Sequence, residues 1–99
     1  MKIKGVADSE QFIIDSILGI FMHKYEFYYY GSRVKGNFRP MSDLDILVKG
    51  DVSQDDLSLI KTLFDNSNLP YIVNLTDYNN IDKDFYELIK VDLVKAIDK

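Results

Sequence analysis

Residues 28–50 of this 99-residue chain read YYYGSRVKGNFRPMSDLDILVKG, and the second half of this stretch determines the fold. The apolar residues Leu44, Ile46 and Val48 occupy every second position, which is the pattern of a strand with one buried face. Asp43 and Asp45 share the opposite face, because successive side chains of a strand point to opposite sides. Neighbouring carboxylates repel each other and are costly to bury unpaired, so we expect a compensating cation here.

Gly31 and Ser32 lie between an aromatic run and a short basic segment. We expect a strand to end at Gly31 and a helical turn to begin at Ser32, where backbone N–H groups converge on one point. Glycine lets an anion approach the backbone, the serine hydroxyl adds a donor, and Arg33 and Lys35 add positive charge. This segment therefore suits a phosphate group. The alternative is an ordinary turn followed by two solvated surface charges.

The aspartate pair also has two interpretations. Hard divalent cations prefer oxygen ligands, and Mg2+ commonly binds one or two carboxylates together with substrate phosphates. In the alternative, Asp43 pairs with Arg39, and Asp45 faces solvent on an edge strand. Ten residues separate Ser32 from Asp43, enough for a helical turn and a return to the sheet. The combination favours a metal site beside a phosphate site, which fits the triphosphate of ATP.

The composition predicts one small globular domain over residues 1–99. The formal net charge of -4 argues against direct, broad binding to nucleic acid, and the absence of cysteine excludes disulfides and thiolate zinc sites. The first residues lack the apolar core of a signal peptide, and the apolar segment 12–22 is too short to span a bilayer. We therefore expect a cytoplasmic protein that is not bound to a membrane.

Hydrophobic periodicity and turn residues predict an α/β (α+β) fold, in which a small mixed sheet has flanking helices. The strands are expected to share one sheet because each is short and has an apolar face. In chain order, the predicted elements are a helix over residues 9–24 with Ser9 as its N-cap, a strand over 25–30, a helical turn over 32–36, a strand over 43–49, a helix opened by Ser53, a strand over 71–76, and a helix from Asp82 through Ile97.

The segment GSRVKGNFRPMSDLDILV, residues 31–48, resembles the signature of the DNA polymerase β-like nucleotidyltransferase superfamily. In that signature, Gly-Ser is followed by ten residues and Asp-x-Asp. More narrowly, the chain resembles the minimal nucleotidyltransferases of bacteria and archaea, whose length and element order match nearly all of it. The resemblance implies a polymerase β-like fold, in which Gly31 and Ser32 hold a nucleoside triphosphate and Asp43 and Asp45 coordinate Mg2+.

The same resemblance implies an activity and a partner. The family transfers a nucleoside monophosphate to a hydroxyl or similar acceptor and releases pyrophosphate. Minimal members are commonly encoded beside a helical HEPN-type protein, as the antitoxin of a toxin–antitoxin pair. In several such pairs, AMP is added to a tyrosine of the toxin. The resemblance thus implies a transferase that uses ATP and acts on a HEPN-type partner.

One position departs from the family pattern. Members usually carry a third carboxylate on the following strand, and the matching segment PYIVNLTD, residues 70–77, has Asn74 there. Asparagine offers a carbonyl oxygen, but it carries no charge and cannot act as a general base. Asp77 lies on the wrong parity for a regular strand and reaches the site only if the strand ends or bends near Thr76. Three alternatives are open: activity with two carboxylates, completion of the site by Asp77 or a partner, or a degenerate domain that only binds its partner.

Overall fold

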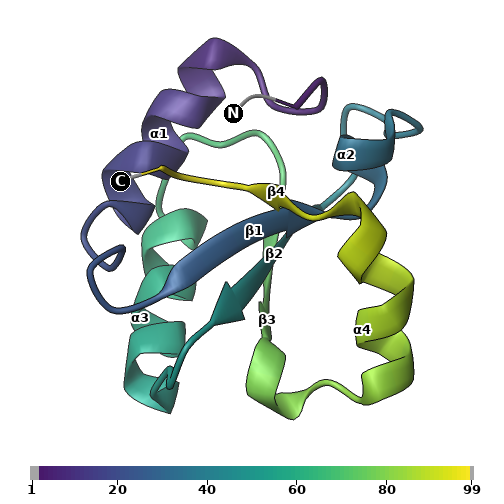
Figure 1. The fold of residues 1–99 in the computed structure, drawn as a ribbon. Helices are drawn as coiled ribbons and strands as arrows, with labels where there is room; N and C mark the ends of the chain where they lie inside the picture. Colours follow the sequence, from purple (N-terminus) through teal and green to yellow (C-terminus); the bar gives the residue numbers. More distant parts are fainter. Residues whose placement is uncertain (1–2, 99) are drawn as a thin grey trace.

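A computed structural model describes residues 3–98, and its strands form one mixed sheet (Figure 1). The strand order is β3-β2-β1-β4. The central strand β1 (Glu26–Tyr30) pairs antiparallel with both β2 (Leu44–Lys49) and β4 (Val94–Lys95), whereas β2 pairs parallel with β3 (Val73–Asp77). The predicted small mixed sheet with flanking helices is confirmed, and β4 is an additional strand.

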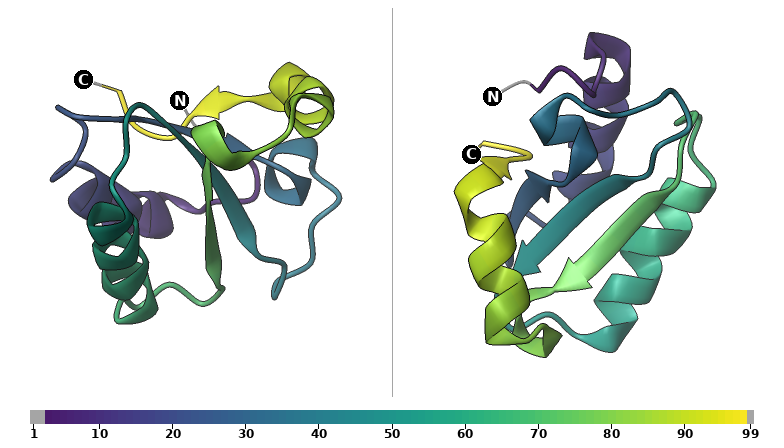
Figure 2. Two further views of the ribbon diagram at one scale, coloured as in Figure 1. Left: turned by 90° about the horizontal axis from the view of Figure 1, so that it is seen from below. Right: turned by 90° about the vertical axis from the view of Figure 1, so that its right-hand side faces the viewer.

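Helices cover both faces of this sheet. Figure 2 shows α1 (Asp8–Leu18) and α3 (Gln54–Asp65) on one face and α4 (Lys83–Ile89) on the other. The short helix α2 (Ser32–Lys35) follows β1 directly, and two 3-10 turns, η1 (Tyr78–Asn80) and η2 (Lys90–Asp92), flank α4. In the described part of the chain, every helix is too short or too polar to cross a bilayer.

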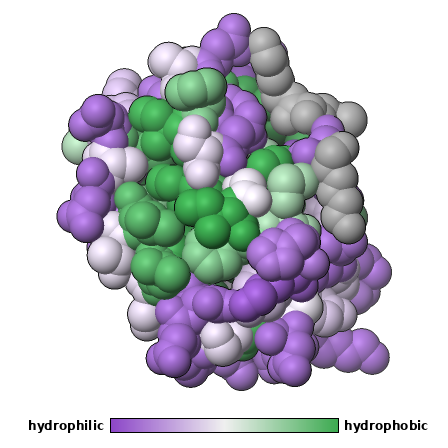
Figure 3. Space-filling model, turned by 90° about the vertical axis from the view of Figure 1, so that its left-hand side faces the viewer, coloured by the Kyte–Doolittle hydropathy of each residue, from purple (hydrophilic) through white to green (hydrophobic). Residues whose placement is uncertain are grey.

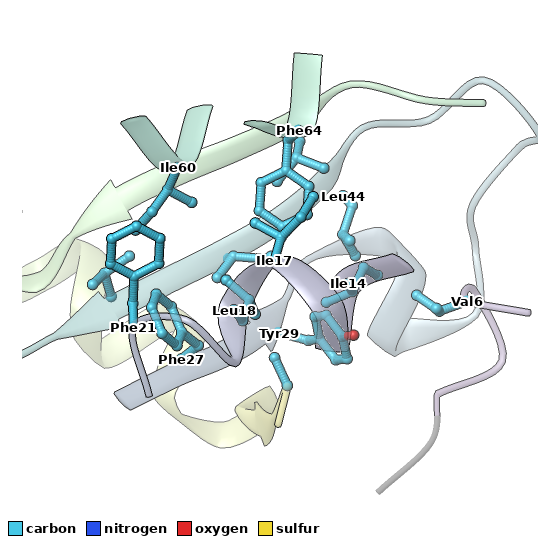
Figure 4. Close-up of a cluster of buried hydrophobic side chains, with 14 of the residues drawn as sticks. Val6, Ile14, Ile17, Leu18, Phe21, Phe27, Tyr29, Leu44, Ile60 and Phe64 are labelled. Carbon is cyan, nitrogen blue, oxygen red and sulfur yellow. The ribbon is translucent and has the colours of Figure 1, made fainter. Parts of the chain in front are cut away.

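The main core fills the space between the sheet and the layer formed by α1 and α3 (Figure 4). Leu44, Ile46 and Val48 of β2 are completely buried there, as their alternation predicts. Burial of an aliphatic side chain of this size contributes about 1.5–3 kcal/mol to stability, so these residues determine which face of β2 points inward. Asp45, one residue out of phase, must therefore point toward the face that α4 covers.

The second face of the sheet is only partly covered. Tyr30 of β1 and Phe85 of α4 meet edge to face with their ring centroids 6.0 Å apart. Lys49 Nζ, at the other end of β2, donates a hydrogen bond of 3.0 Å to the Tyr86 hydroxyl. Asp43, which directly precedes β2, is exposed. Helix α4 thus packs on the face that carries the aspartates and leaves Asp43 open to solvent.

The first helix differs from its prediction at both ends. It begins at Asp8, because the Glu10 carboxylate accepts a hydrogen bond of 3.0 Å from the backbone N–H of Ala7, which is the N-cap two residues before the predicted one. Ser9 is therefore not the N-cap. The helix ends at Leu18, after which residues 19–24 form turns that bury Phe21. The predicted extent to residue 24 is wrong, because the chain must reverse there to enter β1.

The end of the chain also differs from its prediction. The predicted helix starts where expected, and the Asp82 carboxylate caps α4 by accepting a hydrogen bond of 2.8 Å from the Phe85 N–H. The predicted helix through Ile97 is wrong, however, because the helix ends at Ile89 and the following residues form η2 and β4. The free edge of β1 offers hydrogen bonds that a continued helix could not use, and the Ala96 N–H donates one of 2.9 Å to the Phe27 carbonyl.

Hydrophobic side chains also gather on the outer side of the α1 and α3 layer (Figure 3). Phe12, Ile20 and Leu59 are 74%, 56% and 48% exposed. Apolar groups of this kind often mark contacts with other proteins. This side of the molecule is separate from the sheet face that carries the aspartates.

Candidate functional site

Asp43, Asp45 and Asn74 come together where β2 and β3 begin. Asn74 Nδ2 donates hydrogen bonds to Asp43 Oδ2 at 2.9 Å and to Asp45 Oδ1 at 3.3 Å. Asp45 and Asn74 are paired positions on the two parallel strands. Because one donor reaches both carboxylates, the two aspartates lie around a single point, as their spacing predicts.

The Gly31 backbone lies directly against this pair. Tyr30, the preceding residue, is the register partner of Asp45 across β1 and β2. Gly31 has φ 87° and ψ -159°, a conformation essentially restricted to glycine. A Cβ atom at this position would collide with Asp45 Oδ2. Glycine is thus required both for the turn and for the close approach of the Asp45 carboxylate, and the structure brings the two predicted motifs together.

Ser32 and Lys35 lie on α2, which starts at this turn. Ser32 is the first residue of the helix, and the first N–H groups of a helix have no acceptor within it. Lys35 is exposed, and its Nζ lies 3.8 Å from Asp92 Oδ2 in an ion pair. Asp92 belongs to η2, far away in the sequence, and no local pattern indicates this contact. Sequence reasoning therefore missed the residue that shares the charge of Lys35.

The predicted contact of Arg33 with phosphate requires correction. Arg33 is only 4% exposed. Its guanidinium donates hydrogen bonds to backbone carbonyls, including those of Gly5 and Ser42, and lies over the Tyr71 ring. These contacts occupy the guanidinium inside the protein. The physical reason is that the adjacent loop supplies carbonyl groups that need a buried donor.

Two alternatives that the sequence left open are absent from the structure of residues 3–98: Asp77 does not complete the site, and Asp43 does not pair with Arg39. Asp77 continues β3 and caps η1, accepting hydrogen bonds of 2.9 Å from the Asn79 N–H and 3.2 Å from Asn80 Nδ2. Its side chain therefore does not join the aspartate pair. In the same part of the chain, the Asp43 carboxylate accepts its hydrogen bond from Asn74 and not from Arg39.

The surroundings of Asp45 perturb its ionisation. Partial burial raises the pKa of the Asp45 carboxyl, and the nearby Asp43 carboxylate raises it further. The hydrogen bond from Asn74 acts in the opposite direction. A positive charge placed between the two carboxylates would relieve both the burial cost and the repulsion.

The residues present fit a hard divalent cation. Asp43 and Asp45 offer carboxylate oxygens around the point that the Asn74 amide nitrogen now reaches. A half-turn of that amide exchanges nitrogen for oxygen, so Asn74 can add a neutral oxygen ligand. Among residues 3–98, however, no group of three or more His, Cys, Asp or Glu side chains is arranged to hold a metal. Two carboxylates, those of Asp43 and Asp45, are therefore available to a cation at this site.

Comparison with known proteins agrees with this geometry. Residues 13–98 match the family described as Nucleotidyltransferase domain, and the chain belongs to this family. It is also similar to the probable protein adenylyltransferase MntA of Haemophilus influenzae. The two are 33% identical over 87 residues, which cover 86% of this chain and 76% of the relative. The predicted membership of the polymerase β-like nucleotidyltransferases is confirmed.

Proposed function

We propose that this protein transfers AMP from ATP to a hydroxyl group of a partner protein. The observation that carries the proposal is the convergence of Asp43 and Asp45 beside the Gly31 turn. Similarity to a probable protein adenylyltransferase supports the nature of the transferred group and of the acceptor. A cytoplasmic location fits this use of ATP.

In this proposal the donor nucleotide binds at the start of α2. The backbone at Gly31 and Ser32 and the Lys35 ammonium bind the triphosphate, and Asp43 and Asp45 hold Mg2+. When bound, Mg2+ neutralises phosphate charge and favours departure of pyrophosphate. The glycine at position 31 keeps this surface free of a side chain, which allows the phosphates to approach the backbone.

The proposed reaction is a single displacement at the α-phosphorus. The acceptor hydroxyl oxygen forms a bond to this phosphorus, and the bond from phosphorus to the oxygen that bridges the α and β phosphates breaks. Pyrophosphate leaves, and the hydroxyl proton passes to water. Asn74 cannot accept that proton because its side chain is a neutral amide; before Mg2+ binds, its N–H group holds the two aspartates together.

The acceptor in this proposal is a tyrosine of a HEPN-type toxin, and the protein acts as the antitoxin. Helix α4 already covers much of the sheet face, and Asp43 is open to solvent. The exposed position of Asp43 allows a tyrosine of another protein to approach the site from outside. The partner is therefore expected to supply the surface around its own tyrosine.

The decisive experiment is to incubate the protein with ATP, Mg2+ and the HEPN-type protein encoded beside it, and then to weigh the partner by intact-mass spectrometry. We expect the mass to increase by one adenylyl group. Asp43→Asn and Asp45→Asn preserve side-chain shape and should abolish the increase, whereas the exposed control Asp51→Asn should not. Transfer that persists in both site variants would contradict the assignment.

Asn74 favours a second candidate function, that of an antitoxin that only binds its partner. In this case a stable complex would form without any increase in mass. Asn74→Asp, which supplies the third carboxylate of the family pattern, then separates two causes. Recovery of transfer would identify the missing carboxylate as the defect, and continued inactivity would assign a binding role to the domain.

A further inference from the structure

The Arg33 side chain joins segments that are distant in the sequence. Its Nε donates a hydrogen bond of 3.0 Å to the Ser42 carbonyl, and its terminal nitrogens donate to the carbonyls of Pro40 at 3.0 Å and Gly5 at 2.5 Å. The Gly5 N–H in turn donates to the Arg33 carbonyl at 3.2 Å. One side chain thus connects the start of α2, the N-terminal segment and the loop that leads into β2.

Two aromatic rings enclose the same guanidinium. Its central carbon lies 3.8 Å from the centroid of the Tyr71 ring and 5.0 Å from that of Phe38. The Tyr71 hydroxyl donates a hydrogen bond of 3.0 Å to the Glu10 carboxylate, which anchors the ring to α1. Within residues 3–98, the guanidinium therefore contacts neutral carbonyls and aromatic faces, and its orientation is fixed from several sides.

The two aspartates are held in different ways. Asp45 belongs to β2 and is positioned by its strand neighbours Tyr30 and Asn74. Asp43 precedes the strand and is exposed: its carboxylate accepts the hydrogen bond from Asn74, but its backbone lies outside the paired residues of β2. The carbonyl group of Ser42, the residue immediately before Asp43, accepts a hydrogen bond from the Arg33 guanidinium. The loop that determines where Asp43 points is therefore attached to the residue that follows Ser32.

We propose that Arg33 is a positioning residue for Asp43, which keeps this carboxylate in place relative to the Gly31 and Ser32 turn. The inference rests on the proposed nucleotide site. A planar guanidinium with five donors can serve several carbonyls at once, whereas a lysine ammonium is a flexible point charge. The shape of the side chain, and not its charge alone, is therefore what the loop requires.

The test compares Arg33→Lys and Arg33→Met with wild type. Amide hydrogen exchange measures local opening, and titration with an α,β-methylene analogue of ATP and Mg2+ measures binding without turnover. Loss of hydrogen bonds to a charged group should speed exchange in residues 39–43 by about tenfold or more in both variants. Core amides of β1 and β2 should change much less, and the analogue should bind about tenfold more weakly.

The control is Ile60→Val, a conservative change at a fully buried position of α3, with global stability measured by urea unfolding. Exchange that rises evenly throughout the chain, as in this control, would overturn the proposal. Restoration of both readouts by Arg33→Lys would also overturn it, since charge alone would then suffice. If wild type fails to bind the analogue, the nucleotide site is wrong, while the exchange pattern still decides whether Arg33 positions the loop.

Discussion

Asp45 and Asn74 lie opposite each other on parallel strands, and the amide of Asn74 is 3.3 Å from the Asp45 carboxylate. The same amide nitrogen is 2.9 Å from Asp43. A neutral donor thus occupies the position between two carboxylates where a cation would be most stabilising. The hydrogen bonds from Asn74 hold the two carboxylates together, and the response of the site to a metal ion depends on that residue.

Asn74→Asp is expected to make stability depend strongly on Mg2+. Three neighbouring carboxylates repel one another, so the melting temperature should fall in EDTA. Mg2+ should then raise it more than in wild type, because a ligand that binds only the folded state stabilises that state. Thermal unfolding over a Mg2+ series measures both effects, with the exposed Asn68→Asp as control. A variant insensitive to Mg2+ would show that no cation binds between these residues.

Gly31→Ala and Gly36→Ala form a matched pair. Both glycines have positive φ, 87° and 92°, but a Cβ at Gly36 would meet no atom within 4 Å. Gly36→Ala should therefore lose only about 1–2 kcal/mol of stability, the cost of a left-handed backbone for alanine. Gly31→Ala should lose more, because its Cβ would displace the Asp45 carboxylate. Urea unfolding tests this order, and equal losses would contradict the close contact.

Lys35 and Asp92 should affect nucleotide binding in opposite directions. Their ion pair joins an exposed lysine to a partly exposed aspartate, so breaking it should change stability by no more than about 1 kcal/mol. Lys35→Ala removes a proposed phosphate ligand and should weaken ATP binding, while Asp92→Asn releases Lys35 and should strengthen it. Isothermal titration with Mg2+ and ATP at low salt measures both. The same change in both variants would indicate that Lys35 does not bind phosphate.

Tyr25→Phe is expected to reduce stability in a pH-dependent manner. The Tyr25 hydroxyl donates a hydrogen bond of 2.5 Å to Asp56, and this bond, assisted by Lys24, lowers the pKa of the Asp56 carboxyl. A carboxyl whose pKa is lower in the folded state stabilises the protein above its unfolded pKa of about 3.9, and this contribution is lost as the pH falls through the folded value.

The difference in unfolding free energy between wild type and Tyr25→Phe should therefore have its full value at pH 7 and become smaller as the pH is lowered. Urea unfolding at several pH values measures it. Tyr29→Phe is the control, because the Tyr29 hydroxyl donates to the neutral Gln11 side-chain oxygen at 2.7 Å. A difference for Tyr25→Phe that does not change with pH would contradict the coupling to Asp56.

Local patterns predicted much of the fold and the centre of the site. The alternation around Asp45 gave the correct inner face of β2, and Ser53 caps α3, its hydroxyl oxygen accepting a hydrogen bond of 3.0 Å from the Asp56 N–H. Gly31 begins the turn for which its backbone freedom is needed. In each case the physical cause lies within a few neighbouring residues, which is why sequence reasoning could find it.

The errors arise where distant segments compete for a residue. Arg33 looks like a phosphate ligand beside Ser32, but carbonyls of the following loop and of Gly5 draw it inside. Ile97 fits a helical pattern, but the open edge of β1 converts the preceding residues into β4. Both outcomes depend on hydrogen-bond partners that become neighbours only after the sheet has formed.

The pairing of β1 with β4 also has a consequence for synthesis on the ribosome. Tyr28 and Tyr29 of β1 are made early, whereas their partners Lys95 and Val94 are made much later. Until then, the outer edge of β1 has unpaired N–H and C=O groups in an aromatic strand, a template for pairing with other nascent chains. Translation that stalls before residues 94–96 should therefore leave a product prone to aggregation, and prompt completion of β4 protects the newly made protein.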